Sequence, residues 1–349
     1  MTNNNPAAHS CIHPDTEELT RYFEQNKVYT VQIESNLACS QGCLYCYASS
    51  DTSQNRELPD EVIKSVLDSA DRMGIRAVDW LGGDPLVREG WDRLMEYAEE
   101  RGLKNNIWTS GLPLRDMDAA KKAVELSVSG FISVHLDTLD ENLYRKLHTG
   151  PADNIKAILQ GVDNVLTLGK SPECVFNCIT FTRDLAGEDV RRTMSYFFEE
   201  KGVRTCLTQM CGVGLAQKHP EWIPALEDIR EAVMARDEIN YPAADISMST
   251  MDANKYYCGG AICVTVDGDV TPCSVIRKGY GNVLSEPFET IVERNRESLL
   301  YTELRDSRNL PGGCQTCENN SICWGCRALA YYEAGDILAA DPKCWLTKN

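Results

Sequence analysis

The chain alternates short apolar runs with amphipathic stretches from residue 28 to about residue 209. The apolar runs are typical of buried strands, and the amphipathic stretches have the periodicity of helices that end near a glycine. The pattern predicts strands at 28–34, 76–81, 106–109, 130–136, 174–181 and 203–209. It predicts helices near 59–73, 91–101, 117–125, 154–168 and 188–201.

This order is a repeated strand–helix–strand unit. The strands recur at roughly 30 residues per unit, which is the usual length of such a crossover. The expected fold is therefore α/β, with a parallel sheet that curls into a partial (β/α)6 barrel of the TIM type. Because such barrels place their chemistry at the carboxyl ends of the strands, the residues that follow each strand are the first candidates for a site.

Three further regions flank the barrel, which we predict at 28–214. Residues 1–27 form an N-terminal extension. Residues 215–255 carry one helical pattern at 223–236 and then a run rich in Ser, Met and Thr, which predicts a helical linker. Residues 256–349 consist of short apolar pieces, turns and eight cysteines, which indicate a small cysteine-rich domain.

Composition narrows the class of protein. The chain has 349 residues, 43% of them hydrophobic, enough for one large domain and a smaller one. We expect a cytoplasmic protein, because the sequence contains neither an apolar run long enough for a membrane span nor an N-terminal export signal. The net charge of −17 and the absence of a basic stripe disfavour a nucleic-acid partner.

The sixteen cysteines are the most informative part of the composition. Their close spacing in a large chain without an export signal favours metal ligation over disulfides, in a reducing and anaerobic setting. Cys39, Cys43 and Cys46 leave three residues and then two between thiols. A four-iron cluster held by three thiolates has one iron without a protein ligand. That iron can bind a molecule that is to receive an electron from the cluster. The alternatives are a zinc site or buried structural thiols, but three thiolates do not complete tetrahedral zinc.

Eight more cysteines lie in the C-terminal region and divide into two sets of four. The segment 263–273 alternates as two strands around the turn Asp267–Gly268, which brings its end cysteines together. Two CxxC clips follow, at 314–317 and 323–326. Taken alone, these clips indicate a zinc ribbon as readily as an iron–sulfur site.

The triplet, with Tyr45 before its third cysteine, resembles the cluster-binding motif of the radical S-adenosylmethionine (radical SAM) superfamily. In that family SAM chelates the open iron and is split reductively to a 5′-deoxyadenosyl radical, which takes hydrogen from unactivated C–H bonds. The C-terminal set resembles the SPASM domain of radical SAM enzymes that mature peptides and proteins, such as the maturases of anaerobic sulfatases, pyrroloquinoline quinone and mycofactocin. The resemblance spans residues 28–345.

The resemblance implies SAM and three [4Fe–4S] clusters, one that binds SAM and two auxiliary. The implied ligands are Cys39, Cys43 and Cys46 for the first cluster, Cys258, Cys263, Cys273 and Cys326 for the second, and Cys314, Cys317, Cys323 and Cys344 for the third. Two residues separate Cys323 from Cys326, where the family more usually has three. The remaining cysteines, Cys11, Cys174, Cys178, Cys206 and Cys211, are expected to be structural, except that Cys211 is a candidate hydrogen donor at the barrel mouth.

The resemblance also implies contacts to SAM. Gly82-Gly83-Asp84-Pro85 resembles the family's GGEP, a segment suited to the methionyl amine. His135 and Asp137 end the fourth predicted strand where the family often carries Ser-x-Asp near the ribose, and Tyr45 completes the expected cofactor-binding residues. Thr109-Ser110-Gly111 resembles TNG and is expected to form a tight turn beneath SAM. Sulfatase-maturing relatives carry a basic carboxylate where this chain has Ser274, so the catalytic acid or base stays unassigned.

We therefore expect a radical SAM oxidoreductase that modifies a side chain of a peptide or protein. The alternative is the same chemistry on a small molecule such as a tetrapyrrole or cofactor precursor. A lesser alternative is a zinc-stabilised binding protein without catalysis. The expected partners are a peptide or protein substrate, with or without a separate carrier, and an electron donor such as flavodoxin or ferredoxin.

Overall fold

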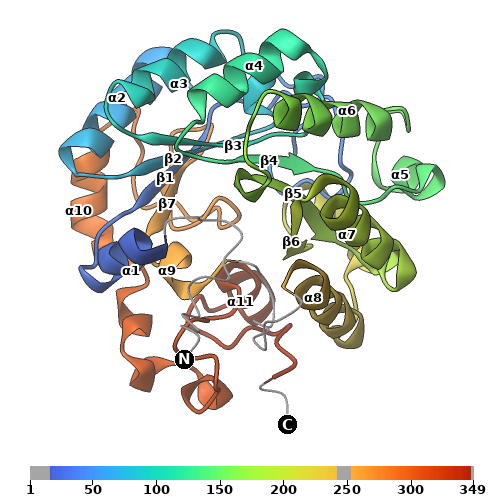
Figure 1. Cartoon of the computed structure of the whole chain (residues 1–349). Helices are drawn as coiled ribbons and strands as arrows, with labels where there is room; N and C mark the ends of the chain where they lie inside the picture. The colour runs from blue at the N-terminus through green and yellow to red at the C-terminus, as the bar shows by residue number, and fades with distance from the viewer. Residues whose placement is uncertain (1–15, 242–252, 347–349) are drawn as a thin grey trace, which may run out of the picture.

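The computed structural model describes residues 16–241 and 253–346. Its centre is an eight-stranded sheet in the order β6-β5-β4-β3-β2-β1-β7-β8, curved with helices on its outer side (Figure 1). Neighbouring strands pair in parallel except β7 and β8, which are antiparallel. The strands are β1 Thr30–Glu34, β2 Ala77–Leu81, β3 Lys104–Trp108, β4 Ile132–His135, β5 Val175–Phe181, β6 Arg204–Gln209, β7 Ala261–Val264 and β8 Val270–Thr271.

Helices cover the convex side of the sheet and continue below it. The outer layer of the barrel comprises α2 Asp60–Arg72, α3 Trp91–Glu99, α4 Met117–Leu126, α5 Glu141–Leu147, α6 Asn154–Thr167, α7 Glu188–Lys201 and α8 Leu226–Asn240. The remaining helices are α1 Thr16–Glu24, α9 Lys255–Cys258, α10 Phe288–Leu299 and α11 Arg327–Ala334. Figure 1 shows α11 beneath the open end of the sheet, among the C-terminal segments.

The strands have an apolar outer face and a polar inner face. Val31 of β1 and Trp80 of β2 belong to the main hydrophobic core, which the strands share with α2, α3, α4 and α6. On the inner face, Gln32 lies opposite Asp79, and Asp79 lies opposite Asn106. Parallel strands covered on both sides are usually apolar throughout. The polar residues on the inner face therefore indicate that the interior of the barrel has a functional role and is not simply a packed core.

The cysteine-rich region is part of the same sheet. Strand β7 pairs with β1 from Thr30 opposite Ala261 to Ile33 opposite Val264. The predicted hairpin is confirmed, but Cys263 lies opposite Thr271, so Cys273 is two residues beyond the paired position. The domain boundary predicted at residue 256 is therefore not a break in the sheet.

The six barrel strands and five barrel helices predicted from the sequence are all present, with ends shifted by a few residues. Helices α1, α5, α9 and α10 were not predicted. Helix α5 is short and is held by its N-cap, Asp140, which accepts from the backbone N–H groups of Asn142 and Leu143. Helix α10 is kinked at Asn295, although its buried residues keep a helical spacing. Cys11 and most of the predicted Ser/Met/Thr-rich linker lie outside the described residues. In the described ranges, no helix is long and apolar enough to cross a membrane.

A buried ion pair ties the segment after the hairpin to β1. The Glu34 side chain is fully buried, and its two oxygens accept hydrogen bonds of 2.8 Å from Nη1 and Nη2 of Arg277. The Arg277 guanidinium also lies 5.4 Å from the ring centroid of Tyr47, which follows the cysteine triplet. This paired geometry matters because a buried carboxylate without a partner is costly.

We expect Arg277→Met to lower the free energy of unfolding by about 3–5 kcal/mol, because it leaves Glu34 buried and unpaired. The double variant Glu34→Gln/Arg277→Met should recover most of this loss. The measurement is anaerobic denaturant unfolding of the cluster-loaded protein, with Arg294→Met, which breaks an exposed pair with Glu286, as a control that should behave as wild type. An unchanged midpoint for Arg277→Met would contradict this account.

Candidate active site

One cavity of about 330 Å³ runs along the inside of the barrel between two groups of cysteines. Cys39, Cys43 and Cys46 line it at the loop after β1, and Cys258, Cys273 and Cys326 line it from the C-terminal region. The loops after β2 and β3 and positions within β4, β5 and β6 also line it. The cavity thus lies where the carboxyl ends of parallel strands predict a site.

The segment after β2 holds the loop that leads to the cysteine triplet. The Gly83 N–H donates to the carbonyl of Asn36 at 2.7 Å, and the Asp84 N–H donates to the carbonyl of Ala38 at 2.7 Å. A Cβ atom on Gly83 would lie 2.1 Å from the Ala38 oxygen, and one on Gly82 would lie 2.3 Å from the Asn36 oxygen. The two glycines are therefore required for the close approach of the two loops, and both line the cavity.

The carboxylate of Asp84, expected to lie near the methionyl amine of SAM, is bound by hydroxyl and backbone donors of the chain. Its carboxylate is fully buried and accepts from Thr109 Oγ1 at 2.8 Å and from the Ser110 N–H at 3.0 Å. It also accepts from the Leu86 N–H at 3.0 Å, as the N-cap of a short 3-10 helix that begins at Pro85. Burial raises the pKa of Asp84, against the opposing effect of the hydrogen bonds from Ser110 and Thr109.

Asp84 therefore fixes the turn after β3 and does not present a free carboxylate to an ammonium group. The Thr109-Ser110-Gly111 turn is present as predicted, with Gly111 at a φ of 85°. Of the Gly-Gly-Asp-Pro segment, the part that reaches the cavity wall is Gly82 and Gly83.

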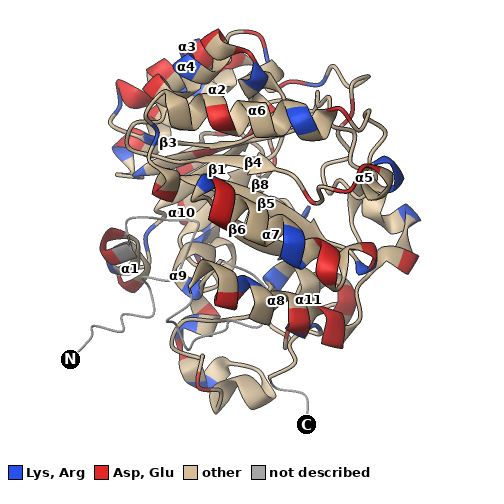
Figure 2. Cartoon of the chain, turned by 45° about the vertical axis from the view of Figure 1, so that its right-hand side comes forward, with Lys and Arg blue, Asp and Glu red and all other residues tan. Residues whose placement is uncertain are grey.

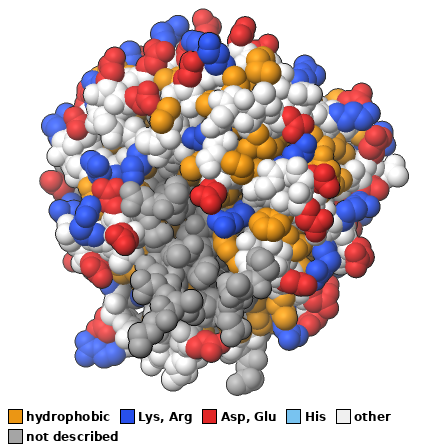
Figure 3. All heavy atoms as spheres, viewed as in Figure 1, with side chains coloured by type: hydrophobic (Ala, Val, Ile, Leu, Met, Phe, Trp, Pro, Cys, Tyr) orange, Lys and Arg blue, Asp and Glu red, His pale blue; other side chains and the backbone are white. Residues whose placement is uncertain are grey.

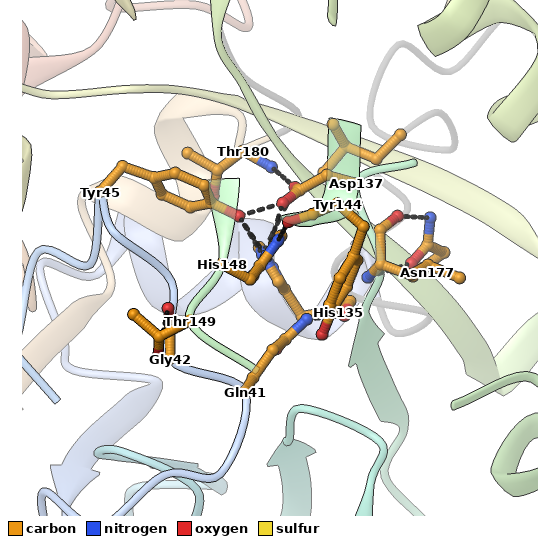
Figure 4. Close-up of polar contacts among 12 residues, drawn as sticks. Gln41, Gly42, Tyr45, His135, Asp137, Tyr144, His148, Thr149, Asn177 and Thr180 are labelled. Atoms are coloured by element: carbon orange, nitrogen blue, oxygen red, sulfur yellow. Dashed lines mark hydrogen bonds and ion pairs between the residues drawn. The ribbon is translucent and has the colours of Figure 1, made fainter. Parts of the chain in front are cut away.

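Tyr45 belongs to a buried polar network behind the triplet (Figure 4). Its hydroxyl donates to Asp137, and Asp137 also accepts from the Thr180 N–H at 2.9 Å. Nε2 atoms of His135 and His148 each lie 3.3 Å from an Asp137 oxygen. Burial alone would raise the pKa of Asp137, but the two histidines more than offset it and lower that pKa.

In this network Asp137 orients its neighbours. Tyr45 and His135 line the cavity, whereas Asp137 does not, which disfavours the direct ribose contact expected of it. His148 was missed from the sequence because it follows the unpredicted helix α5. The only signal for it is spatial, since its backbone forms a bridge with that of Cys43.

The triplet is chemically suited to a cluster. None of the fifteen described cysteines forms a disulfide. Burial raises the pKa of Cys39 and Cys46, whereas His148 and His135 overcome burial at Cys43 and lower its pKa to about 6. Cys43 Sγ also lies within 4.8 Å of ligand atoms of His135 and His148, a grouping that a single metal ion would suit. Both imidazoles are already engaged with Asp137, so the three thiols are the better donor set.

The C-terminal cysteines form two groups. Cys314, Cys317, Cys323 and Cys344 line one small cavity, as the predicted set of four requires. Of the other predicted set, Cys258, Cys273 and Cys326 line the main cavity, whereas Cys263 is fully buried in β7 and does not. Burial raises the pKa of Cys258 to about 12 and that of Cys323 to about 11, so these thiols become thiolates only when a metal binds.

Two other cysteines reach the main cavity. Cys211 lines it as anticipated, packed near Cys273 and Cys326. Cys178, expected to be structural, lines it as well. Cys206 is buried among the aromatic side chains at the amino-terminal side of the sheet, consistent with a structural role.

Comparison with known families agrees with this geometry. Residues 33–197 match the radical SAM superfamily, and residues 258–318 match the SPASM iron–sulfur cluster-binding domain. The chain is a radical SAM enzyme with a SPASM domain. SAM and iron–sulfur clusters are its cofactors, and together they supply the radical chemistry while the chain binds and encloses the reactants.

Individual relatives are distant but similar along most of their length. The Fe-coproporphyrin III synthase of Methanosarcina barkeri is 26% identical over 94% of this chain and 90% of its own. The mycofactocin maturase MftC of Mycobacterium tuberculosis is 26% identical over 89% of this chain and 81% of its own. The structure of Streptococcus suis SuiB bound to its precursor peptide SuiA shares the fold, with a TM-score of 0.66 and 18% identity over 95% of this chain and 80% of SuiB.

Anaerobically reconstituted protein should hold about twelve irons, because eleven cysteines divide into sets of three, four and four, each for a four-iron cluster. Iron and sulfide analysis with visible absorption measures this. Near-stoichiometric zinc without iron–sulfur absorption would instead favour a zinc-stabilised protein.

Replacing Cys39, Cys43 and Cys46 together by Ala should abolish 5′-deoxyadenosine formation from SAM with dithionite, because only this set leaves an iron open. Cys314→Ala should retain part of it. Cys174→Ala, a cysteine that lines neither cavity, is the matched control and should retain all of it. Equal 5′-deoxyadenosine from the triple variant and the parent would overturn the assignment.

Proposed function

We propose that this enzyme modifies a side chain of a peptide or small protein with the SAM-derived radical. The three cysteine sets hold the clusters as assigned above, and Gly82, Gly83, His135 and Tyr45 face SAM from the cavity wall. The observation that carries the proposal is the small number of charged groups that line the cavity. His135 is one of them, because its pKa, which burial alone would lower, is raised by Asp137. Among the described residues that line the cavity, Arg327 is the one Lys or Arg, and no Asp or Glu lines it.

Arg327 is largely engaged by the protein, with only its Nε left without a hydrogen-bond partner. Its side chain is buried, and its guanidinium donates to the backbone carbonyls of Trp324, Ile337 and Ala339. A porphyrin with several propionate carboxylates needs charged partners when it leaves water, since buried charges without partners are costly. The described wall offers Arg327 and His135, and both already bind protein groups, which disfavours a tetrapyrrole substrate despite the similarity to the Fe-coproporphyrin III synthase. A peptide that inserts one uncharged side chain needs no such partner.

The outer surface favours a basic peptide. The chain carries 52 acidic and 35 basic residues, and Figures 2 and 3 show the two signs interspersed, without a large basic area on the faces drawn. Opposite charge speeds encounter, and salt screens this effect. We also propose a cytoplasmic, anaerobic setting, with a flavodoxin or ferredoxin as electron donor and a separate carrier for the peptide.

The test pairs two candidate substrates with cluster-loaded enzyme, SAM and dithionite. One is a short peptide encoded beside the gene, and the other is coproporphyrin III. We expect a mass change of the peptide and, with deuterated peptide, deuterium in 5′-deoxyadenosine. We also expect peptide capture to weaken as salt is raised. If the porphyrin is modified and the peptide is not, the peptide assignment must be dropped.

A further inference from the structure

A further buried carboxylate lies inside the barrel, apart from the cysteine triplet. Asp79 is fully buried on the inner face of β2. Its Oδ2 accepts from the hydroxyl of Tyr257 at 2.6 Å, and its Oδ1 accepts from Asn106 Nδ2 at 2.8 Å. The Tyr257 oxygen in turn accepts from Gln32 Nε2 at 2.6 Å.

This network reaches the cavity through Tyr257. Tyr257 and Gln32 line the cavity, whereas Asp79 lies behind them. The Ser274 N–H donates to Gln32 Oε1 at 3.2 Å, so the chain of hydrogen bonds begins at the wall beside Cys273. Tyr257 is therefore the polar contact between the cavity contents and Asp79.

Asp79 differs from the buried aspartates Asp84 and Asp137. Asp84 is used to fix a turn, and Asp137 is held ionised by two histidines. Asp79 has no cationic partner among the described residues. Burial raises its pKa to about 6, against the opposing hydrogen bonds from Tyr257 and Asn106. A carboxylate with a pKa near neutrality is suited to accept a proton.

Polar side chains from β1, β3 and α9 surround Asp79. The described side chains that face it are Gln32 from β1, Asn106 and Trp108 from β3, and Tyr257 from α9. Only Tyr257 among them is ionisable, and its hydroxyl donates to Asp79. The phenol can therefore give its hydrogen to Asp79 as its oxygen receives another from the cavity side, without itself becoming an anion.

We propose that Asp79 is the proton acceptor of the reaction and that the phenol of Tyr257 conducts the proton to it from the substrate. The proposal rests on the proposed function. After the adenosyl radical has removed a hydrogen atom, an X–H bond of the substrate radical breaks and an O–H bond forms on Tyr257. The Tyr257 hydrogen moves to Asp79, the bonding pair stays on the substrate, and one electron then leaves to a one-electron acceptor of the iron–sulfur class.

The first test needs no substrate. Infrared spectra of the cluster-loaded enzyme should show a protonated carboxyl band that disappears as pH rises through about 6. Asp79→Asn should remove the band, and Tyr257→Phe should shift it, because the hydrogen bond to Asp79 is lost. A spectrum without such a titrating band between pH 5 and 8 would overturn the proposal, whatever the substrate is.

The second test uses the neighbouring-gene peptide with SAM and dithionite. The wild-type rate of peptide oxidation should rise with pH through about 6, since the ionised carboxylate accepts the proton. Asp79→Asn should lower this rate about 100-fold or more and flatten its pH profile, while 5′-deoxyadenosine is still formed. Tyr257→Phe should lower the rate similarly. Asp68→Asn, the same change on the outer helix α2, is the control and should match wild type.

The outcomes separate a catalytic from a structural role. Because charging buried Asp79 costs folding free energy as pH rises through its raised pKa, Asp79→Asn should melt no lower than wild type at pH 8. Peptide oxidation by Asp79→Asn at the wild-type rate would refute the proton-acceptor role. If wild type itself leaves the peptide unchanged, the proposed function fails, and the infrared titration still decides the state of Asp79.

Discussion

The pairing of β1 with strands on both sides is the constraint on which the rest of the structure depends. On one side β2 begins the barrel, and on the other β7 brings in the cysteine-rich region. The loop that follows β1 carries Cys39, Cys43 and Cys46, so this single strand places the radical-generating site between the two halves of the molecule. The buried pair of Glu34 in β1 and Arg277, which follows β8, then stabilises the attachment of the cysteine-rich region to β1.

The interior of the barrel shows how one residue type takes three roles through its surroundings. Asp84 is satisfied by hydroxyl and backbone donors and serves as a structural anchor. Asp137 lies against two imidazoles and stays charged, which orients Tyr45. Asp79 meets only neutral donors, so burial dominates its pKa. The differences come from which residues surround each carboxylate: Asp79 lies within β2, Asp84 follows β2 and Asp137 follows β4.

Much of the barrel was predictable because its signals are local. Helical periodicity and the glycines after the helices located the barrel elements, and cysteine spacing located the groups of thiols. The features of the site that the sequence does not reveal depend on contacts between distant residues. The carboxylate of Asp84 is occupied by Thr109 and Ser110, and His148 meets Asp137 only through folding of an unpredicted helix. Likewise, Tyr257 is 178 residues from Asp79, and no sequence spacing joins them.

The place of β7 in the sheet also bears on how the chain is synthesised. A ribosome completes β1 to β6 long before it reaches β7, so one flank of β1 has no partner while most of the protein is being made. Exposed strand flanks invite pairing with other chains, and non-local pairing is slow. We infer that the nascent barrel must be protected until β7 emerges. Cutting the chain between the radical SAM and SPASM matches, 33–197 and 258–318, would leave β1 unpaired on the side where β7 binds.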